Sequence, residues 1–270
     1  MRWSNLKPAR PWAVLLAALP FAAAILAYVV ASDLRRAENP QDRLLPAPAQ
    51  LAATAGRLAT EADRRSGEVL LWADTGASLR RLGLGLGITA ALGLGFGLSL
   101  GMLPAARAGL SPFVAVVSLI PPLAVLPILF IAFGLGELSK VALIVIGTAP
   151  VLIRDLAQRA LEIPTEMKVK AETLGASSWT LIARVGLPQL MPRLIQGLRL
   201  ALAPAWLFLI AAEAVASTEG LGYRIFLVRR FFAMDVILVY VAWIALLAFL
   251  ADLALRTLQR RAFPWAGEAA

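Results

Sequence analysis

Long runs of uncharged, mostly apolar residues alternate with shorter charged stretches along this chain. The first run covers residues 12–31. As an α-helix it would rise about 30 Å, the thickness of the hydrocarbon core of a bilayer, so it predicts a first transmembrane helix. Arg2, Lys7 and Arg10 precede it, which also fits a cleaved signal peptide. We favour a retained helix, because the run is longer than a typical signal-peptide core and no small-x-small cleavage site closes it before Asp33.

The pattern changes over residues 32–81, where acidic and basic residues nearly balance. Three prolines break any long helix there, Pro40, Pro46 and Pro48. Apolar residues at helical spacing nevertheless predict a short amphipathic helix over residues 50–62. We expect this whole segment to lie at the membrane surface on the extracytoplasmic side.

A second uncharged run, residues 82–106, is rich in glycine. Several of its glycines are four residues apart, in the pairs Gly83/Gly87, Gly93/Gly97 and Gly97/Gly101. Small residues at this spacing let helix backbones approach closely within a bilayer. The same glycines superficially resemble a dinucleotide-binding loop, but no strand–helix–strand pattern surrounds them, so helix packing is the better interpretation.

The third run, residues 108–136, is interrupted by Ser111-Pro112, Pro121-Pro122 and Pro127. A proline within a spanning helix frees a carbonyl that neighbouring groups must satisfy. These sites therefore predict a kinked helix packed inside the protein.

Three further spans follow, residues 141–153, 200–217 and 236–251. The first of them is too short to cross a bilayer alone, so we expect it to extend to residue 157 or beyond, with Lys140 reaching the interface. The pattern thus predicts an all-α, polytopic membrane bundle of about six transmembrane helices, with a five-helix core over residues 82–257. Six spans place both ends, residues 1–11 and 258–270, on one side, and their basic character indicates the cytoplasm.

Composition agrees with a membrane protein, since 60% of the residues are hydrophobic and 16% are charged. Soluble domains are typically about 45–50% apolar and about 25% charged. The chain has no cysteine and no histidine, which excludes disulfides, Cys/His zinc sites, thiol chemistry and histidine-dependent triads. The net charge of +9 comes from basic residues scattered between apolar runs, which fits cytoplasmic helix ends rather than nucleic-acid binding.

A polar segment over residues 154–199 separates the fourth and fifth spans. Pro164 suits a first helical turn, a helix is expected over residues 166–174, and Gly175 should end it with a positive φ. Ser177 or Ser178 can cap the next helix, which presents Trp179, Leu181, Ile182 and Val185 before Leu187-Pro188 ends it. An ordered helix–glycine–helix unit at the cytoplasmic face favours docking on a partner protein.

This segment also carries a family resemblance. Residues 171–179, Ala-Glu-Thr-Leu-Gly-Ala-Ser-Ser-Trp, followed by Val-Gly-Leu-Pro at 185–188 and Pro192, resemble the EAA loop of permease subunits of binding-protein-dependent ABC importers. In that family the loop forms a coupling helix that sits in a cleft of the cytoplasmic ATPase. The resemblance implies that ATPase coupling falls to Ala171, Leu174, Gly175, Ala176, Ser177, Trp179, Leu187 and Pro188. The chain departs from the family at the name-giving Glu-Ala-Ala, where it has Val169-Lys170-Ala171.

Further fragments resemble the nitrate/sulfonate/taurine branch of these permeases. They are Asp74-Thr75, Ser78-Leu79-Arg80-Arg81, Ile120-Pro121-Pro122-Leu123-Ala124 with Pro127, Phe133-Gly134-Leu135-Gly136, Gly197-Leu198-Arg199, Trp206, Ala212-Glu213, Gly220-Leu221-Gly222-Tyr223, Asp252, Arg260-Arg261 and Pro264-Trp265. Ser118 and Val125 depart from the branch, which has a basic residue and a tryptophan at these positions.

The resemblance implies the partners and the place of ATP. The family works in the bacterial inner (plasma) membrane as a pair of permeases, here expected to be a homodimer, with a cytoplasmic ATPase dimer and an extracytoplasmic substrate-binding protein. The chain has no G-x-x-x-x-G-K-[ST] phosphate loop, so we expect it to bind no cofactor and to leave ATP to the partner subunit.

Five residues are candidates for the translocation path, Pro121, Pro122, Pro127, Trp206 and Glu213. A carboxylate within a span is costly and usually faces a protein interior or a water-filled path. For Glu213 the alternatives are a buried ion pair with Arg199 or Arg224, or a place near the outer interface. For Trp206 the alternative is an interfacial anchor, and for the prolines a simple kink. Ser177 and Trp179 could likewise be only a helix cap and an interface anchor.

Two other classes of protein remain open. A secondary transporter or channel acting alone would suit broken helices, although we find no internal repeat. A membrane enzyme would need an activated nucleophile or a carboxylate pair, and Glu213 and Asp252 are expected on opposite sides of the membrane. Within the importer interpretation, the branch suggests a small anion such as nitrate, an alkyl sulfonate or taurine, and a heterocyclic vitamin precursor is equally compatible.

Overall fold

The computed structural model describes residues 9–39, 43–64 and 66–266 of the chain, so Arg2, Lys7 and the last four residues lie outside the described part. Within it the regular structure is helical, without a strand. The α-helices are α1 (Arg10–Glu38), α2 (Pro48–Thr60), α3 (Leu70–Met102), α4 (Pro104–Val117), α5 (Pro122–Phe133), α6 (Glu137–Leu161), α7 (Thr165–Thr173), α8 (Ser178–Leu181), α9 (Leu187–Ala216), α10 (Leu221–Arg229) and α11 (Met234–Ala262). A π-turn, η2 (Ile182–Gly186), joins α8 to α9, and a short 3-10 turn, η3 (Pro264–Ala266), follows α11.

Five stretches of helix are long and apolar enough to cross a membrane, namely α1, α3, α6, α11 and the run from α8 through α9. The pair α4 and α5 passes the same test together but is bent by 94°. Counting this pair as one broken span gives six, which confirms the predicted all-α polytopic bundle.

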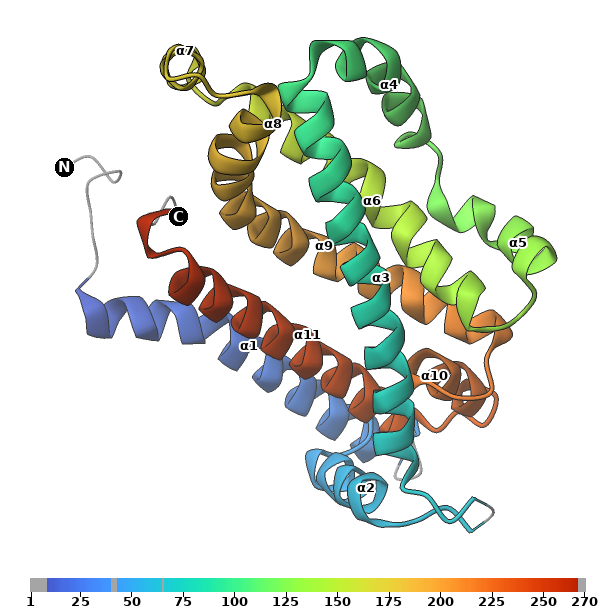
Figure 1. The fold of residues 1–270 in the computed structure, drawn as a ribbon. Helices are drawn as coiled ribbons and strands as arrows, with labels where there is room; N and C mark the ends of the chain where they lie inside the picture. The colour runs from blue at the N-terminus through green and yellow to red at the C-terminus, as the bar shows by residue number, and fades with distance from the viewer. Residues whose placement is uncertain (1–8, 40–42, 65, 267–270) are drawn as a thin grey trace.

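The bundle has two distinct ends (Figure 1). The helices α7 and α8 project at one end, on the side where the described chain begins and ends. The short helices α2 and α10 lie at the opposite end. In the predicted orientation, the first end is cytoplasmic and the second is extracytoplasmic.

The packing of α3 against α6 rests on a ridge of small residues along α3. The ridge consists of buried residues four apart, Gly85, Thr89, Gly93, Gly97 and Gly101. A Cβ at position 93 would lie 2.7 Å from a side-chain carbon of Leu152, and one at 97 would lie 2.6 Å from the Cβ of Leu156. The Thr89 and Thr148 hydroxyls share a buried hydrogen bond of 2.8 Å across the same contact. The close approach predicted for these glycines is therefore confirmed for Gly93, Gly97 and Gly101.

The same expectation is wrong for Gly83 and Gly87. A Cβ at either position would meet nothing within 4 Å. Gly85, which lies between them, faces α6 instead. The ridge runs from Gly101 toward the N-terminus of α3 in steps of four residues, and Gly85 is part of it. The four-residue spacing of the glycines can be read from the sequence. The sequence alone does not show whether the set with Gly83 and Gly87 or the set with Gly85 faces α6.

The boundary between the surface segment and the second span also differs from the expectation. The helix α2 confirms the predicted amphipathic helix over 50–62. However, α3 begins at Leu70, so residues 70–81 form its first turns rather than a surface segment. Asp74 and Arg81 do not end the helix, because both are buried and paired inside the protein.

The proline-rich third run is broken rather than kinked. Leu103 is extended and separates α3 from α4, and residues 118–121 separate α4 from α5. A proline disfavours the helical conformation of the residue before it, which accounts for the break ahead of Pro121-Pro122, whereas Pro127 is accommodated within α5. Both helices lie largely exposed on the described chain, with one buried residue in α4 and two in α5, so the expected interior packing was wrong.

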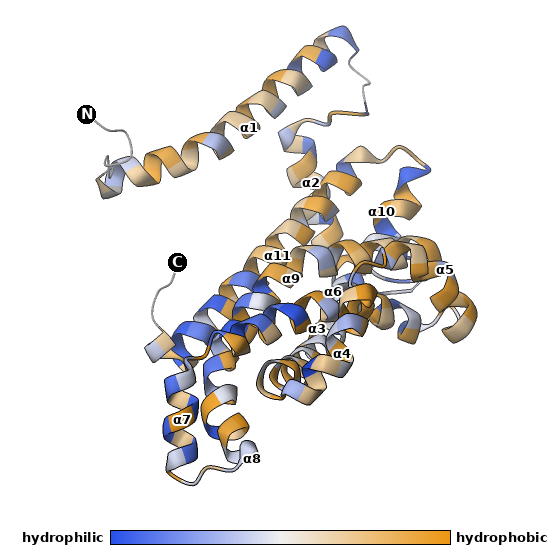
Figure 2. Cartoon of the chain, turned by 90° about the horizontal axis from the view of Figure 1, so that it is seen from above, coloured by the Kyte–Doolittle hydropathy of each residue, from blue (hydrophilic) through white to orange (hydrophobic). Residues whose placement is uncertain are grey.

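The helix α1 stands apart from the rest of the chain (Figure 2). Its apolar side chains are exposed along most of its length. It is tied only near its outer end, where the Tyr28 hydroxyl donates to the Pro46 carbonyl at 2.6 Å and the Ser32 hydroxyl donates to the Leu45 carbonyl at 2.9 Å. This end of α1 is thereby held beside the start of α2.

Candidate functional site

The projecting unit formed by α7 and α8 has almost no buried surface. No side chain of α7 is buried, and Leu174 and Trp179 are 89% and 77% exposed. Large apolar side chains displayed in this way at the end of a bundle are unusual on a surface that faces only water. They form a ready contact for another protein.

The turn between the two helices is tightly specified. Gly175 has a φ of +82°, its N–H donates to the Glu172 carbonyl at 2.9 Å, and the Ala176 N–H donates to the Ala171 carbonyl at 3.0 Å. This pair of bonds is the Schellman motif, in which glycine supplies the left-handed residue. The Ser177 hydroxyl then accepts from the Thr180 N–H at 3.2 Å and caps α8. The predicted helix–glycine–helix unit is confirmed, with Ser177 rather than Ser178 as the cap and with Pro164 one residue before the first helical turn.

The end of this unit was predicted wrongly. Leu187-Pro188 does not stop the second helix, which passes through the π-turn η2 directly into α9. A π-turn shifts the hydrogen-bond register, and Pro188 lies in the first turn of α9, where its missing N–H is tolerated. Arg154 and Arg199, the expected limits of the polar segment, lie within α6 and α9, so the part between the two membrane-crossing runs shrinks to residues 162–177.

A second cluster of functional interest lies at the opposite end of the bundle and centres on Glu213, which is fully buried in α9. One carboxylate oxygen accepts from the Arg81 guanidinium at 2.7 Å and from the Ser78 hydroxyl at 2.8 Å. The other accepts from the Gly222 N–H at 2.9 Å. A buried charge requires such complete pairing, and here α3 and the first turn of α10 supply it.

Arg81 connects this pair to two further carboxylates. Its guanidinium donates to both oxygens of Glu137 at 2.7 Å, to the Glu219 side chain at 3.1 Å and to the Glu219 carbonyl at 3.0 Å. Lys140 reaches Glu137 at 3.1 Å. One arginine thus joins α3, α6, α9 and the loop that follows α9.

A parallel set of contacts surrounds Asp74, about two turns before Arg81 on α3. Its carboxylate accepts from Arg224 at 2.8 Å, from the Gly220 N–H at 2.9 Å and from the Tyr240 hydroxyl at 3.2 Å. Burial lowers the pKa of Arg224, but the Asp74 carboxylate offsets this, and the pKa lies above its usual value. The two sets together fix α10 and the loop 217–220 onto α3 and α11; we call this ensemble of Asp74, Ser78, Arg81, Glu137, Glu213, Glu219, Arg224 and Tyr240 the outer ion cluster.

The outer ion cluster identifies the charged partner of Glu213, which is Arg81. Of the two arginines considered from the sequence, Arg199 instead binds Asp252 at 2.7 Å and Arg224 binds Asp74. Arg81 was missed, because it was assigned to the surface segment. The available signal was Asp74, Ser78 and Arg81 at spacings of four and three, which places them on one helix face.

The other candidate path residues lie in two different settings. Trp206 is 4% exposed within the main core, and its indole N–H finds no hydrogen-bond partner among the residues that the structure describes. Pro121 and Pro127 are exposed and Pro122 is partly exposed, at the start and middle of α5. Leu126 and Leu129 of α5 belong to the same core cluster as Trp206, which brings α5 and α9 near one another.

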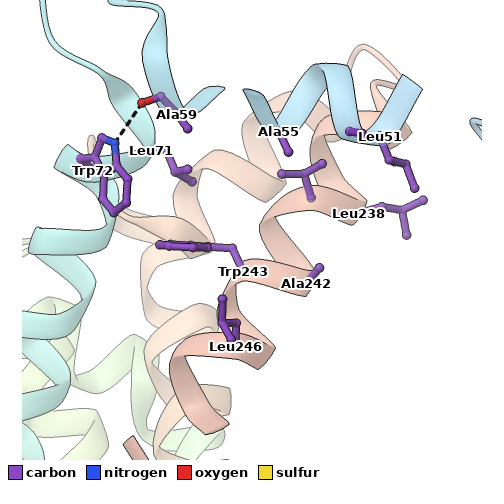
Figure 3. Close-up of a pocket in the computed structure, with 11 residues that line it drawn as sticks. Leu51, Ala55, Ala59, Leu71, Trp72, Leu238, Ala242, Trp243 and Leu246 are labelled. Carbon is purple, nitrogen blue, oxygen red and sulfur yellow. Dashed lines mark hydrogen bonds between the residues drawn. The ribbon is translucent and has the colours of Figure 1, made fainter. Parts of the chain in front are cut away.

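An apolar groove of about 460 Å³ lies between α2, the start of α3 and the outer half of α11 (Figure 3). The Trp72 indole N–H donates to the Ala59 carbonyl at 3.0 Å, and the Trp243 indole N–H donates to the Thr75 hydroxyl at 2.9 Å. The two rings pack edge to face with centroids 5.4 Å apart. These contacts dock α2 on the bundle and leave the groove open beside it.

Residues 83–264 match the model of one protein family, described as the binding-protein-dependent transport system inner membrane component. This chain belongs to that family. It is accordingly a multi-pass inner membrane permease subunit of the ABC importers, and the resemblance noted in its sequence is confirmed.

Individual relatives of this permease agree. It is 39% identical over 203 residues to the taurine transport system permease protein TauC of Escherichia coli, covering 74% of this chain and 73% of that protein. It is 30% identical over 195 residues to the putative aliphatic sulfonates transport permease protein SsuC of Bacillus subtilis, covering 70% and 68% of the two chains. It is 32% identical over 148 residues to the nitrate import permease protein NrtB of Synechococcus elongatus, covering 55% and 53%.

The fold of this permease is also found among solved structures. A chain of the MetNI methionine ABC transporter in an inward-facing conformation superposes with a TM-score of 0.64 at 21% identity. The match covers 71% of this chain and 95% of that chain. This likeness concerns the fold alone.

Proposed function

We propose that this permease carries a small sulfonate, taurine or an alkyl sulfonate, through a homodimer driven by a separate ATPase and fed by an extracytoplasmic binding protein. The observation that carries the coupling part is the Schellman-capped α7–α8 unit with Leu174 and Trp179 exposed. The sulfonate part rests on the 39% identity to the taurine permease.

The ATPase is a separate protein in this proposal. The sequence of the chain contains no phosphate-binding G-x-x-x-x-G-K-[ST] loop, so it offers no place for ATP hydrolysis. Ala171, Gly175, Ala176 and Ser177 shape the docking unit through their turn and cap, while Leu174 and Trp179 make the contact. Leu187 and Pro188 act by joining the unit to α9.

We assign the path to the side of the bundle where α5 meets α9. Broken helices line the sites of many transporters, and α4–α5 is the broken pair here. In this proposal Pro121, Pro122 and Pro127 shape the break, and the unpartnered indole N–H of Trp206 offers a donor toward the path. Glu213 contributes indirectly, by holding the outer end of α9 in the outer ion cluster.

The test combines partner capture with uptake. The tagged chain is purified from membranes in mild detergent, and co-purifying proteins are identified by mass spectrometry. Wild type should retain an ATPase, and Leu174→Asp and Trp179→Ala should lose most of it while remaining in the membrane. Phe231→Ala, which removes an equally exposed aromatic ring at the opposite end, serves as the matched control and should retain the ATPase.

Two outcomes would contradict the proposal in different ways. A wild-type chain that purifies without any ATPase would favour a stand-alone transporter. A chain that retains its ATPase but takes up no taurine or alkyl sulfonate in reconstituted vesicles, with its binding protein present, would leave the coupling intact and reject the substrate.

A further inference from the structure

A small pocket between α3, α4 and α6 is lined by two arginines and by no acidic residue. It is a half-open hollow of about 210 Å³ near the end of the bundle that bears α7, and Arg154 is exposed at its rim. Its lining residues come from the last turns of α3 and α6 and from α4. The polar ones are Arg107, Ser111, Arg154 and Gln158, and no aspartate or glutamate lines it.

Among the described residues, both arginines of the pocket donate to neutral acceptors and neither forms an ion pair. Arg107 donates from Nε to the Leu100 carbonyl at 3.0 Å and from Nη2 to the Gly101 carbonyl at 3.3 Å. Arg154 donates from Nη1 to the Ser118 hydroxyl at 2.8 Å. Each guanidinium has five N–H donors, so both keep donors for a further acceptor.

Four other cations of the spanning helices are paired with acids: Arg81, Lys140, Arg159 and Arg199 each lie within 4.0 Å of a carboxylate. Arg193 of α9 has a neutral partner, the side-chain oxygen of Gln196 at 3.1 Å, but its pocket is also lined by Glu162. A cation within a membrane segment is costly unless it is paired, and such residues commonly mark a binding site. Two guanidiniums that share one pocket without a carboxylate are therefore expected to bind an anion that is not part of the chain.

The position of the pocket adds a second, independent argument. Arg154 lies seven residues before the end of α6, about 10 Å along the helix axis by the standard rise per residue. The Ser118 hydroxyl that it contacts lies at the C-terminal end of α4, where the broken span turns by 94°. The pocket thus lies beside this break, which is of the kind that transporters use for binding, and within reach of the inner membrane surface.

We propose that this pocket binds an oxyanion, the sulfonate or phosphate group of a small ligand, between Arg107 and Arg154. Planar guanidinium groups match the oxygens of such groups in paired hydrogen bonds, and Ser111 and Gln158 supply further donors. The oxyanion has two possible sources, the head group of an anionic phospholipid or the transported sulfonate. Only the second source rests on the proposed function.

The test measures both sources on the purified full-length permease. Delipidated protein in detergent is titrated with phosphatidylglycerol, followed by native mass spectrometry, and separately with radiolabelled taurine in equilibrium dialysis. The double variant Arg107→Gln/Arg154→Gln should lower the affinity for one of the two probes at least tenfold. Arg184→Gln, which changes an exposed arginine at the same end of the bundle, is the control and should bind as wild type does.

Each outcome decides one point. Loss of phosphatidylglycerol binding alone supports the pocket and names a lipid as its source, whereas loss of taurine binding alone names the substrate. Wild-type affinity of the double variant for both probes, or a wild-type protein that binds neither, would overturn the pocket. The lysine variants Arg107→Lys/Arg154→Lys keep the charge and should recover part of the affinity, which separates loss of the site from misfolding.

Failure of the proposed function would be distinguishable. A permease that binds phosphatidylglycerol through these arginines but shows no taurine uptake would reject the sulfonate assignment and leave the pocket standing.

Discussion

Gly220 lies directly against the carboxylate of Glu213, so that a Cβ at position 220 would stand 2.5 Å from the carboxyl carbon. Its φ of +120° is likewise open mainly to glycine. Both the small space around position 220 and its backbone conformation therefore require glycine. The loop after α9 can fold over Glu213 only because position 220 carries no side chain.

The first prediction concerns this contact. Gly220→Ala should lower the thermal stability of the purified permease clearly, because the added methyl group displaces the carboxylate from Arg81 and strains the loop. Gly136→Ala is the matched control, since Gly136 has an ordinary φ of −77° and open space around its Cβ position. Equal melting temperatures for the two variants in detergent would contradict the close packing described for Gly220.

The second prediction concerns the central ion pair. Arg81→Gln should destabilise the protein by about 3–5 kcal/mol, because it leaves the buried carboxylate of Glu213 without its charged partner. Glu213→Gln should cost less, because Arg81 keeps its ion pairs with Glu137 and Glu219. The double variant should cost less than the sum of the two, since both charges are then absent. Denaturation in detergent measures these differences, and Arg80→Gln, which removes an exposed arginine, should change stability by no more than about 1 kcal/mol. Strict additivity of Arg81→Gln and Glu213→Gln would argue against a direct pair.

The third prediction compares two glycines on the same helix. Gly97→Ala should lower the melting temperature, because its methyl group would meet Leu156 across the α3–α6 contact. Gly95→Ala should leave it unchanged or raise it slightly, because nothing lies within 4 Å and alanine favours helix over glycine by up to about 1 kcal/mol. A destabilised Gly95→Ala variant together with a stable Gly97→Ala variant would show that Gly95, and not Gly97, lies on the face of α3 that packs against α6.

The fourth prediction addresses coupling. Gly175→Val should leave the spanning helices in place but reduce ATP-driven uptake strongly, because a β-branched residue strains the left-handed turn that orients α7 and α8. Uptake and ATP hydrolysis are measured together in reconstituted vesicles. Gly67→Val imposes the same kind of strain at a φ of +72° in a turn at the opposite end, and it should keep the two activities coupled. Normal coupled uptake by Gly175→Val would count against the docking role of the α7–α8 unit.

The fifth prediction uses the unpartnered indole of Trp206. Trp206→Phe should be neutral or stabilising, because it removes a buried donor that has no acceptor while retaining an aromatic ring. If the N–H serves the translocation path, uptake should nevertheless fall. Unchanged stability combined with unchanged uptake would show that Trp206 only fills the core.

Much of the fold followed from the sequence because its determinants are local. Uncharged runs marked the spans, and Gly175 with the serines at 177 and 178 marked the turn and the cap. A positive φ and helix capping depend on neighbouring residues only. The boundaries at Leu70 and Leu187 could not be obtained in this way. A charged residue usually ends a span, and Arg81 continues one only because Glu213, far away in sequence, neutralises it.

The outer ion cluster shows the same limit more sharply. Asp74 and Arg81 stand on one face of a helix in the sequence, but their partners Arg224 and Glu213 come from other elements. Helical spacing identifies which residues share a face and not which face meets which neighbour. For that reason Glu213 was recognised as costly, while its partner was sought among the wrong arginines.

The ridge on α3 restricts how this bundle can move. The backbones of α3 and α6 approach so closely that the ridge glycines leave no room for a Cβ. Rotating either helix would drive the flanking side chain of Leu94, Phe96 or Leu98 into this contact. Sliding them would break both the Thr89–Thr148 hydrogen bond and the Arg81–Glu137 ion pair. We therefore expect the two helices to travel as a single rigid body, and the bundle to open at the break between α4 and α5.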